Sequence, residues 1–276
     1  MSDHLPPSSP LKRILDGYLP FAYRPIRAAY HTYSGFRFRR EYARLAEKII
    51  AARGSRVMSG PFAGMNYLDT ACSSALLPKL LGTYEDELHP TLARLLARPY
   101  DTVVDIGCAE GYYAVGLALQ LPQSKVLAYD IDPLALRRCG ELAELNGVRD
   151  RIDLRSPFEP ADMLELGERR VLVVCDVDGY ETTLFAAGMS KYWTGADLLI
   201  ELHDFMGSPC REIVERCLAA THRLQIIRSE DKPASKIADF TFLTEEERRL
   251  AVSELRPPQE WLVAYRKDES VAPARN

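Results

Sequence analysis

The sequence predicts an α/β protein built on a doubly wound, mostly parallel sheet of seven strands, preceded by a helical N-terminal extension. Three observations lead to this fold class. An apolar, β-branched run over residues 103–106 leads through a glycine turn into an apolar helix pattern, as a buried parallel strand does at the carboxyl edge of a sheet. Strand and helix patterns then alternate along the rest of the chain. Before this run, the pattern is mainly helical.

These patterns divide the chain into four segments. Residues 1–10 are rich in proline and serine and are expected to be a disordered tail. Residues 11–95 form the helical extension, residues 96–268 hold the sheet, and residues 269–276 are a second disordered tail. The extension contains apolar residues at helical spacing: Phe38, Tyr42, Leu45, Ile49 and Ile50.

Seven apolar segments are expected to form the strands of the sheet. They are residues 103–106, 125–129, 152–154, 171–175, 198–202, 224–227 and 261–265. The segment 171–175 is apolar throughout, which indicates a central position. The expected helices between strands are residues 114–121, 133–145, 209–220 and 244–255. The helix boundaries rest on Pro133 in a first turn, on Asn146-Gly147 as a stop, and on Thr244 with Glu247 as a capping box.

The composition is that of an ordinary soluble globular protein, with 47% hydrophobic and 27% charged residues. No apolar run approaches the roughly 20 residues that a membrane helix needs. The first residues carry no basic region followed by an apolar core, so we expect no secretory signal. Six cysteines are scattered singly with no C-x-x-C pair, which favours a reducing compartment without structural zinc. A cytoplasmic protein is expected.

Charge is distributed unevenly along the chain. Residues 1–60 contain 11 basic and 4 acidic residues, whereas the remainder contains 24 basic and 35 acidic residues. The acidic body argues against nucleic acid as a partner, because phosphate neutralisation drives that binding. The basic arm, which includes Arg24, Arg27 and Arg37, contains interleaved aromatic residues and could contact a membrane surface or an anionic partner. A solvated helix face that packs its aromatic residues on the main domain explains the same pattern.

The turn after the first strand predicts a nucleotide-sized ligand with positive charge. Gly107 allows a sharp turn, and small residues keep the following backbone open. Asp105 and Glu110 disfavour a diphosphate and favour a cation, and the G-x-G-x-x-G pattern of dinucleotide sites is absent. S-adenosylmethionine has a sulfonium and an ammonium group and no phosphate, so it is the cofactor we infer. The expected cofactor-binding residues of this turn are Asp105, Gly107, Cys108, Ala109, Gly111 and Tyr112.

The second strand ends in an acid that suits a ribose. Asp130 lies 25 positions after Asp105, and an ionised carboxylate at this place in nucleoside-binding folds accepts hydrogen bonds from the ribose hydroxyls. Ile131 is expected to cover one face of the adenine. A helix N-terminal acid would explain Asp130 alone, but its pairing with the first turn favours cofactor binding.

Three acids follow the fourth strand: Asp176, Asp178 and Glu181. Carboxylates are costly to hold together at the end of a central strand unless a cation is bound. That cation could be the sulfonium end of the cofactor, a substrate amine or a divalent metal. Alternatively, Asp176 and Asp178 cap the next helix while Glu181 faces water. We expect Asp176 to serve both cofactor binding and catalysis.

His203 is the single histidine expected at the end of a central strand, and alternation places Glu201 on the same side of that strand. An imidazole beside carboxylates suits a general base that takes a proton from a hydroxyl, so His203 is the expected catalytic base. A structural histidine is the alternative. A variant of the hypothesis places a divalent metal at Asp176, Asp178 and His203, although no metal is required.

Together these motifs resemble the FkbM-type family of S-adenosylmethionine-dependent methyltransferases. The resemblance covers roughly residues 80–205 and is carried by the first turn, by Asp130, by the run from Asp176 to Glu181 and by Glu201-Leu202-His203. It implies a class I, Rossmann-like methyltransferase fold and O-methylation of a hydroxyl on a small molecule, sugar, glycan or natural product. It also implies that Tyr84 and Glu85, upstream of the first strand, approach the cofactor.

This sequence departs from the family pattern at two places. Cys108-Ala109-Glu110 replaces the more usual Ala-Asn-Ile type of turn, and Asp178 stands where Glu is commoner. No Asn-Pro-Pro-Tyr-like run follows the fourth strand, so methylation of an exocyclic amine loses support. Two other classes remain open: a methyltransferase fold kept as a non-catalytic binding module, and a nicotinamide-dependent oxidoreductase, which the missing glycine pattern disfavours.

Overall fold

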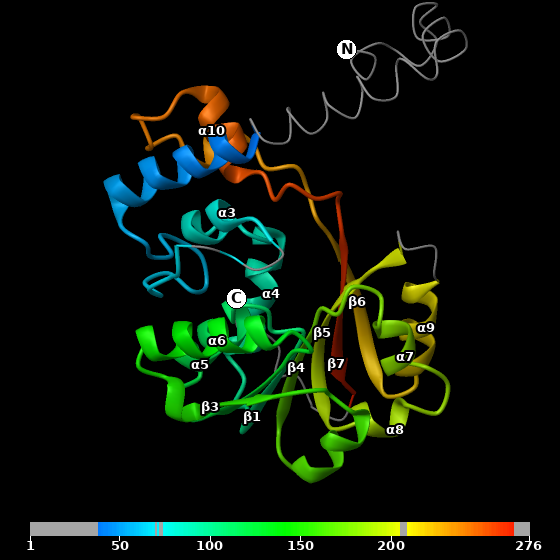
Figure 1. Cartoon of the computed structure of the whole chain (residues 1–276). Helices are drawn as coiled ribbons and strands as arrows, with labels where there is room; N and C mark the ends of the chain where they lie inside the picture. The colour runs from blue at the N-terminus through cyan, green and yellow to red at the C-terminus, as the bar shows by residue number, and fades with distance from the viewer. Residues whose placement is uncertain (1–37, 70, 72–73, 205–208, 268–276) are drawn as a thin grey trace, which may run out of the picture. The chain divides into compact units, whose positions relative to one another are not determined.

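The protein contains the predicted seven-stranded sheet (Figure 1) in a computed structural model that describes residues 38–69, 71, 74–204 and 209–267. The strand order is β3-β2-β1-β4-β5-β7-β6. The first five strands of this order are parallel, and β7 runs antiparallel to both β5 and β6. The predicted α/β fold class and the mostly parallel sheet are confirmed.

All seven predicted strands are present, and most are one or two residues longer than their apolar segments. They are β1 Thr102–Ile106, β2 Lys125–Tyr129, β3 Ile152–Arg155, β4 Val171–Cys175, β5 Ala196–Leu202, β6 His222–Arg228 and β7 Glu260–Arg266. The extra residues lie at the strand ends, are mostly polar, and belong to the strands because they pair with neighbouring strands. In β6, for example, His222 pairs with Arg266 and Arg228 pairs with Glu260. His222, two residues before the expected segment 224–227, is therefore the first residue of β6.

The helices around the sheet follow the predicted alternation. They are α5 Tyr112–Gln120, α6 Pro133–Leu145, α7 Glu181–Leu184, α8 Ser190–Trp193, α9 Cys210–Leu218 and α10 Glu245–Val252, with single 3-10 turns η3 Arg149–Arg151, η4 Pro160–Leu166 and η6 Ala234–Ile237. The bounds of α6 are as predicted, because the Asp132 side chain accepts a hydrogen bond from Leu134 N at 2.8 Å and fixes its first turn. The helices expected over 209–220 and 244–255 are shorter, and α5 begins two residues earlier than expected.

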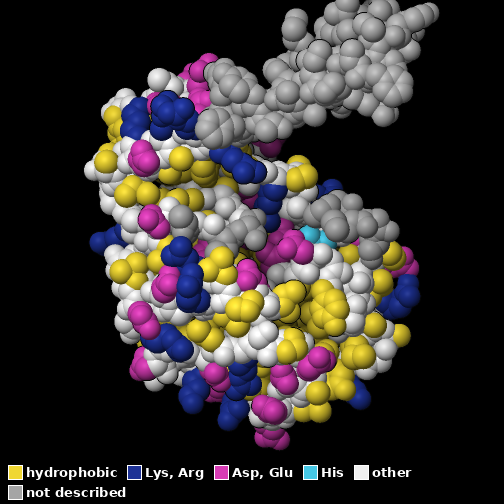
Figure 2. Space-filling model, in the orientation of Figure 1, with side chains coloured by type: hydrophobic (Ala, Val, Ile, Leu, Met, Phe, Trp, Pro, Cys, Tyr) yellow, Lys and Arg dark blue, Asp and Glu magenta, His cyan; other side chains and the backbone are white. Residues whose placement is uncertain are grey.

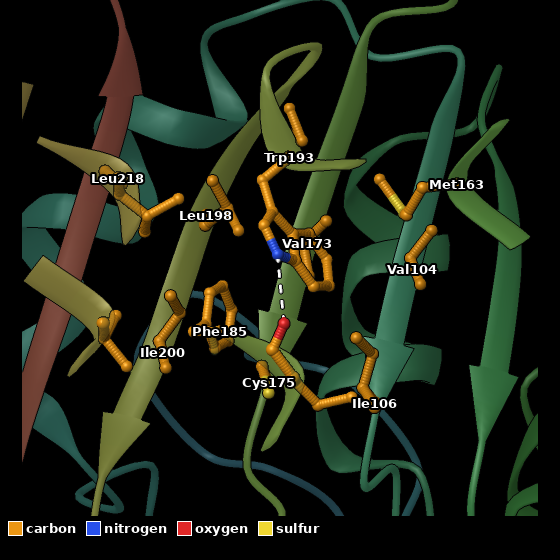
Figure 3. Packing of buried hydrophobic residues seen from close by; sticks show 14 of the residues in the cluster. Val104, Ile106, Met163, Val173, Cys175, Phe185, Trp193, Leu198, Ile200 and Leu218 are labelled. Carbon is orange, nitrogen blue, oxygen red and sulfur yellow. Dashed lines mark hydrogen bonds between the residues drawn. The ribbon is translucent and has the colours of Figure 1, made fainter. Parts of the chain in front are cut away.

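Two layers of helices cover the sheet (Figure 1). The helices α5 and α6 pack on one face, and α7, α8 and α9 pack together on the other. Every residue of β1 and β4 is buried, which confirms the central position predicted for residues 171–175. A cluster of buried side chains fills the second face (Figure 3), where Trp193 stacks on Phe185 with ring centroids 4.7 Å apart. This rigid packing holds the strand ends in place.

The described residues before the sheet are helical at first and then irregular. Residues 38–53 form a helix, which agrees with the predicted spacing. Short helices return at α3 Leu76–Leu81, η2 Asp86–Leu88 and α4 His89–Leu96. The compact unit that contains the sheet begins at Arg53, so it includes about half of the stretch that we assigned to the extension. The predicted tails and the arginines of the basic arm up to Arg37 lie outside the described residues.

An insertion of about thirty residues, 229–259, separates β6 from β7 and contains η6 and α10. The helix α10 packs against α3. Among the helices that the structure describes, none combines the length and the apolar character needed to cross a bilayer.

The register of the sheet brings the carboxyl ends of four strands together. Ile106 at the end of β1 pairs with Tyr129 of β2 and with Cys175 of β4. Cys175 in turn pairs with Ile200 of β5. The residues that follow these positions therefore share one edge of the sheet, which is where ligands bind in open α/β folds.

Candidate functional site

The turn after β1 packs directly against the end of β4. Gly107 has a φ of 84°, and a Cβ atom on it would lie 1.8 Å from the carbonyl oxygen of Asp176. Only glycine allows this approach. Next to the turn, Asp105 is buried and its Oδ2 has no hydrogen-bond partner among the described residues. Burial, reinforced by the nearby charge of Asp176, raises the pKa of Asp105 to about 8.

Asp130, at the end of β2, holds the same turn from the other side. Its Oδ2 accepts a hydrogen bond from Ala109 N at 2.9 Å, and its Oδ1 accepts one from Asp132 N at 2.8 Å. Each carboxylate oxygen has a further lone pair, so both oxygens can still accept bonds from a ligand. Ile131 beside it is 84% exposed. An exposed apolar side chain next to an acid suits a nucleoside, whose base is apolar and whose ribose is polar.

Glu110 does not serve the role that we predicted for it. Its buried carboxylate accepts hydrogen bonds from Tyr67 OH at 2.6 Å and from Lys79 Nζ at 2.5 Å. Burial acts to raise the pKa of Glu110, but Lys79 outweighs burial and lowers it. We expected Glu110 to favour a cationic ligand. The cation beside it is instead Lys79 of the same chain, which neutralises it.

Tyr84 and Glu85 lie against the start of α5. Tyr84 packs edge-on to Tyr112 with ring centroids 5.3 Å apart. The buried carboxylate of Glu85 accepts hydrogen bonds from Tyr113 OH and from the guanidinium of Arg256. Burial raises the pKa of Glu85 to about 7, although Arg256 opposes the shift. The structure thus connects these two residues to the same turn as Gly111 and Tyr112.

A second group of ionisable side chains lies at the ends of β4 and β5. We call it the acidic edge, and it consists of Asp176, Asp178, Glu181, Glu201 and His203. His203 is 3% exposed, and its Nδ1 lies 2.8 Å from Glu181 Oε1. Its Nε2 lies 3.6 Å from Asp176 Oδ1, 3.7 Å from Asp178 Oδ1 and 3.9 Å from Glu201 Oε2. Acidic side chains lie beside a histidine on the face drawn in Figure 2.

The acidic edge contains more carboxyl groups than cations, so ionising all of them is unfavourable. Burial raises the pKa of Asp176, although His203 opposes the shift. Burial raises the pKa of Glu201 to about 11, and the charges of Asp176 and Glu85 add to this effect. Burial acts to lower the pKa of His203, but Glu181 and Asp176 outweigh it and raise it. Such groups are concentrated at functional sites.

Glu181 is buried and bonds to both His203 and the backbone of Val177, with Val177 N donating at 3.0 Å. It does not face water, as the alternative interpretation required. The described part of the chain contains one group of side chains spaced to hold a metal ion, namely Asp176, Asp178 and His203. All three were proposed for this purpose from the sequence.

Sequence reasoning missed the cations of the site. Arg256, from the insertion between β6 and β7, donates to Glu201 Oε1 at 2.8 Å as well as to Glu85. Its guanidinium also lies over the ring of Tyr84, 5.3 Å from the centroid. Arg256 follows no strand end and belongs to no motif, so its sequence position carries no signal. The excess of acids at the strand ends was the one indication that a cation was needed.

A comparison with protein families matches residues 90–177 to the model of ribosomal protein L11 methyltransferase (PrmA). Among curated relatives, the ribosomal protein L11 methyltransferase of Alteromonas mediterranea is 44% identical over 85 residues, which are 28% of this chain and 27% of that one. The same enzyme of Salmonella arizonae is 41% identical over 64 residues, or 23% and 22% of the two chains. The chain thus spans about a quarter of the length of these relatives.

Two solved structures are similar at lower identity. A putative O-methyltransferase from Klebsiella pneumoniae is 17% identical with a TM-score of 0.45, covering 65% of this chain and 78% of that one. An O-methyltransferase from Bacillus cereus is 11% identical with a TM-score of 0.40, covering 64% and 81%.

The strand order, with an antiparallel β7 inserted between β5 and β6, is that of the class I methyltransferase fold. The family match runs from α4 to the end of β4. It includes Asp105, Asp130 and Asp176, and it ends before Asp178 and His203. The family match therefore covers the part of the site that we expect to hold the cofactor, together with Asp176 of the acidic edge.

Proposed function

We propose that this protein is an S-adenosylmethionine-dependent methyltransferase that methylates a hydroxyl group on a small molecule, sugar or glycan, and that it is of the FkbM type. The observation that carries the proposal is the gathering of Asp105, Asp130, Asp176 and His203 at one edge of the sheet. The family match over residues 90–177 supports the cofactor. The acceptor is inferred from the acidic edge.

The residues at the ends of β1 and β2 fit the cofactor. Asp130 has free lone pairs for the ribose hydroxyls, and Ile131 is exposed beside it. Asp105 carries a buried carboxylate oxygen without a partner among the described residues, and acidic surroundings suit a ligand with two positive groups and no phosphate. When bound, S-adenosylmethionine supplies a methyl group on a positively charged sulfur that leaves as a neutral thioether.

The acidic edge is the part of the site suited to the acceptor. Forming the carbon–oxygen bond requires the hydroxyl to lose its proton, and we assign this loss to the group around His203 and Asp176. Glu181 holds the imidazole in one orientation, so it is placed before the acceptor arrives. Negative charge at this edge repels phosphate-rich acceptors, which is consistent with a hydroxylated acceptor rather than nucleic acid.

The cofactor is tested by thermal unfolding of the full chain with and without S-adenosylmethionine. We expect a rise in Tm for the wild type. Asp130→Ala should lose this rise, because it removes the acceptor of the ribose hydrogen bonds. Asp150→Ala, an exposed acid in η3, is the matched control and should keep it. No shift of the wild type at millimolar cofactor would refute the proposal.

The acceptor is tested with isotopically labelled methyl donor and a panel of hydroxylated small molecules and sugars, with ribosomal protein L11 included because the relatives are named for it. We expect label on a hydroxyl compound, and loss of transfer in His203→Ala. Transfer to L11 alone would show that the methyl donor is assigned correctly and that the hydroxyl acceptor is wrong.

A further inference from the structure

Three carboxylates from two strand ends face one ring nitrogen. The Nε2 atom of His203 lies 3.6 Å from Asp176, 3.7 Å from Asp178 and 3.9 Å from Glu201. These separations exceed the roughly 2.7–3.2 Å of an N–H···O hydrogen bond. The four side chains therefore surround a common space.

The other ring nitrogen is already held by a buried carboxylate. Glu181 Oε1 lies 2.8 Å from His203 Nδ1, and because a carboxylate accepts, Nδ1 is the atom that carries hydrogen. The lone pair of the imidazole is then on Nε2 and points toward the three acids. A histidine that binds a metal is held in this way, with its second nitrogen donating to a carboxylate.

Buried oxygens at the same place provide a second, independent observation. Glu201 is 0% exposed. Its Oε1 is bound by Arg256 at 2.8 Å, whereas its Oε2 has no hydrogen-bond partner among the residues that the structure describes. That orphaned oxygen is the one that approaches His203 Nε2. A buried acceptor without a partner is costly, and a cation in the common space would satisfy it.

We infer that the acidic edge binds a divalent transition-metal ion, with Asp176, Asp178 and His203 Nε2 as ligands and Glu201 Oε2 as a fourth oxygen beside them. One imidazole with several carboxylates favours Mn²⁺ or Zn²⁺ over Ca²⁺. Ligands bound to such an ion lie about 3.0–3.5 Å apart. The ligand atoms of Asp176, Asp178 and His203 lie within 4.8 Å of one another, so they must move closer together when the ion binds. The Asp178 side chain, 93% exposed, is free to move in this way.

The role of the ion, unlike its binding, rests on the proposed methyltransferase function. Three protein ligands leave coordination positions open, and the exposed side of Asp178 leads to them. An acceptor hydroxyl bound there has its pKa lowered by the ion, so its proton passes to solvent as the carbon–oxygen bond forms. His203 then acts as a ligand of the ion, which replaces the role of general base expected from the sequence.

Binding is tested without cofactor or acceptor. The purified full chain is stripped with a chelator, and Mn²⁺ is then titrated while the electron paramagnetic resonance signal of the free ion is followed. We expect one Mn²⁺ per chain. Asp178→Asn should weaken binding at least tenfold. Glu181→Gln, whose side chain contacts His203 Nδ1 and Val177 N and not the ion, should weaken it by about 10–100-fold. Asp150→Asn should bind as the wild type does.

Thermal unfolding of each variant checks that it is folded. Asp178→Asn should fold as the wild type does, because the Asp178 side chain is exposed. Binding of neither Mn²⁺ nor Zn²⁺ at millimolar concentration would overturn the inference, as would equal affinity of Asp178→Asn and wild type. Metal binding without a cofactor-dependent Tm shift would refute the proposed function and leave the metal site standing. A cofactor-dependent rise in Tm without metal binding would refute the metal site and leave the proposed function standing.

Discussion

Two buried groups of ionisable side chains differ in whether their carboxyl groups have partners within the chain. The closed ion group consists of Tyr67, Lys79 and Glu110. One carboxylate there meets one ammonium at 2.5 Å and one hydroxyl at 2.6 Å, and both charged side chains are nearly fully buried. Every strong interaction of Glu110 is made within the chain, so this group has no need of a ligand.

The acidic edge is the opposite case. Its four carboxylates surround a single imidazole, and the guanidinium of Arg256 reaches only Glu201 among them. Buried oxygens of Glu181 and Glu201 have no partner among the described residues. Both groups are costly to bury, but of the two the acidic edge is the one with unpartnered carboxyl oxygens that a cation could bind. The difference separates a group that stabilises the fold from one that is arranged for a ligand.

The largest effect is expected in the closed ion group. Lys79→Met should lower the free energy of unfolding by about 3–5 kcal/mol, because it leaves a buried carboxylate without its cation. Urea unfolding followed by circular dichroism measures this. Lys125→Met, at an exposed lysine, is the control and should change stability by less than about 0.5 kcal/mol. Equal effects of the two substitutions would contradict the distinction between the groups.

A smaller effect is expected from the pH dependence of Asp105. Its pKa is raised to about 8 in the folded protein, so the folded state holds the proton more tightly than the unfolded chain. The stability it contributes is complete below the unfolded pKa of about 3.9 and is lost as pH rises toward 8, at about 1.4 kcal/mol per pH unit. Asp105→Asn should therefore become more stable relative to wild type between pH 5.5 and 7.5.

Thermal unfolding between pH 5.5 and 7.5 measures the difference in stability between Asp105→Asn and the wild type, with Asp150→Asn as the control. The pKa of Glu110 is lowered, so its contribution has the opposite sign and is lost as pH falls below about 4.5. A wild type and an Asp105→Asn variant with parallel pH profiles would show that Asp105 is ionised in the folded protein throughout the range.

The smallest change in stability is expected at the acidic edge itself. Burial raises the pKa of Glu201 to about 11, so Glu201→Gln leaves the charge near neutral pH unchanged and keeps an oxygen for Arg256. The free energy of unfolding should therefore stay within about 1 kcal/mol of the wild type. Methyl transfer should fall at least tenfold, because glutamine cannot ionise to provide an anionic oxygen beside the metal ion. Urea unfolding and a labelled-methyl assay measure the two effects. A loss of stability as large as that of Lys79→Met would show that the acidic edge is structural.

Much of the fold could be predicted because strands and helices follow local patterns. The helix over residues 133–145 was predicted to the residue, since its proline and its cap are adjacent in sequence. Strand ends were less accurate. His222 and Arg228 join β6 because residues of β7, more than thirty positions away, pair with them, and no local pattern encodes that partner.

In the candidate site too, the residues at strand ends were predicted and their partners distant in sequence were not. Asp105 lies near the end of β1, and Asp130, Asp176 and His203 each follow a strand. Their common edge was therefore predicted from the chain order of a parallel sheet. The interpretation of Glu110 was wrong because its cation, Lys79, lies 31 positions away in α3. Arg256 was missed because it is separated from Glu85 by 171 positions.

The turn after β1, its acids and the seven-strand alternation follow from the sequence alone, because hydrophobic periodicity and turn chemistry act between neighbours in the chain. The pairing of buried acids with cations does not follow from the sequence alone. Whether a buried carboxylate is neutralised or left for a ligand depends on which cation the folded chain brings within a few ångströms, since Coulomb energy falls with distance in space. Folding assigned Lys79 to Glu110 and Arg256 to Glu85 and Glu201, and it left the oxygens around His203 uncompensated.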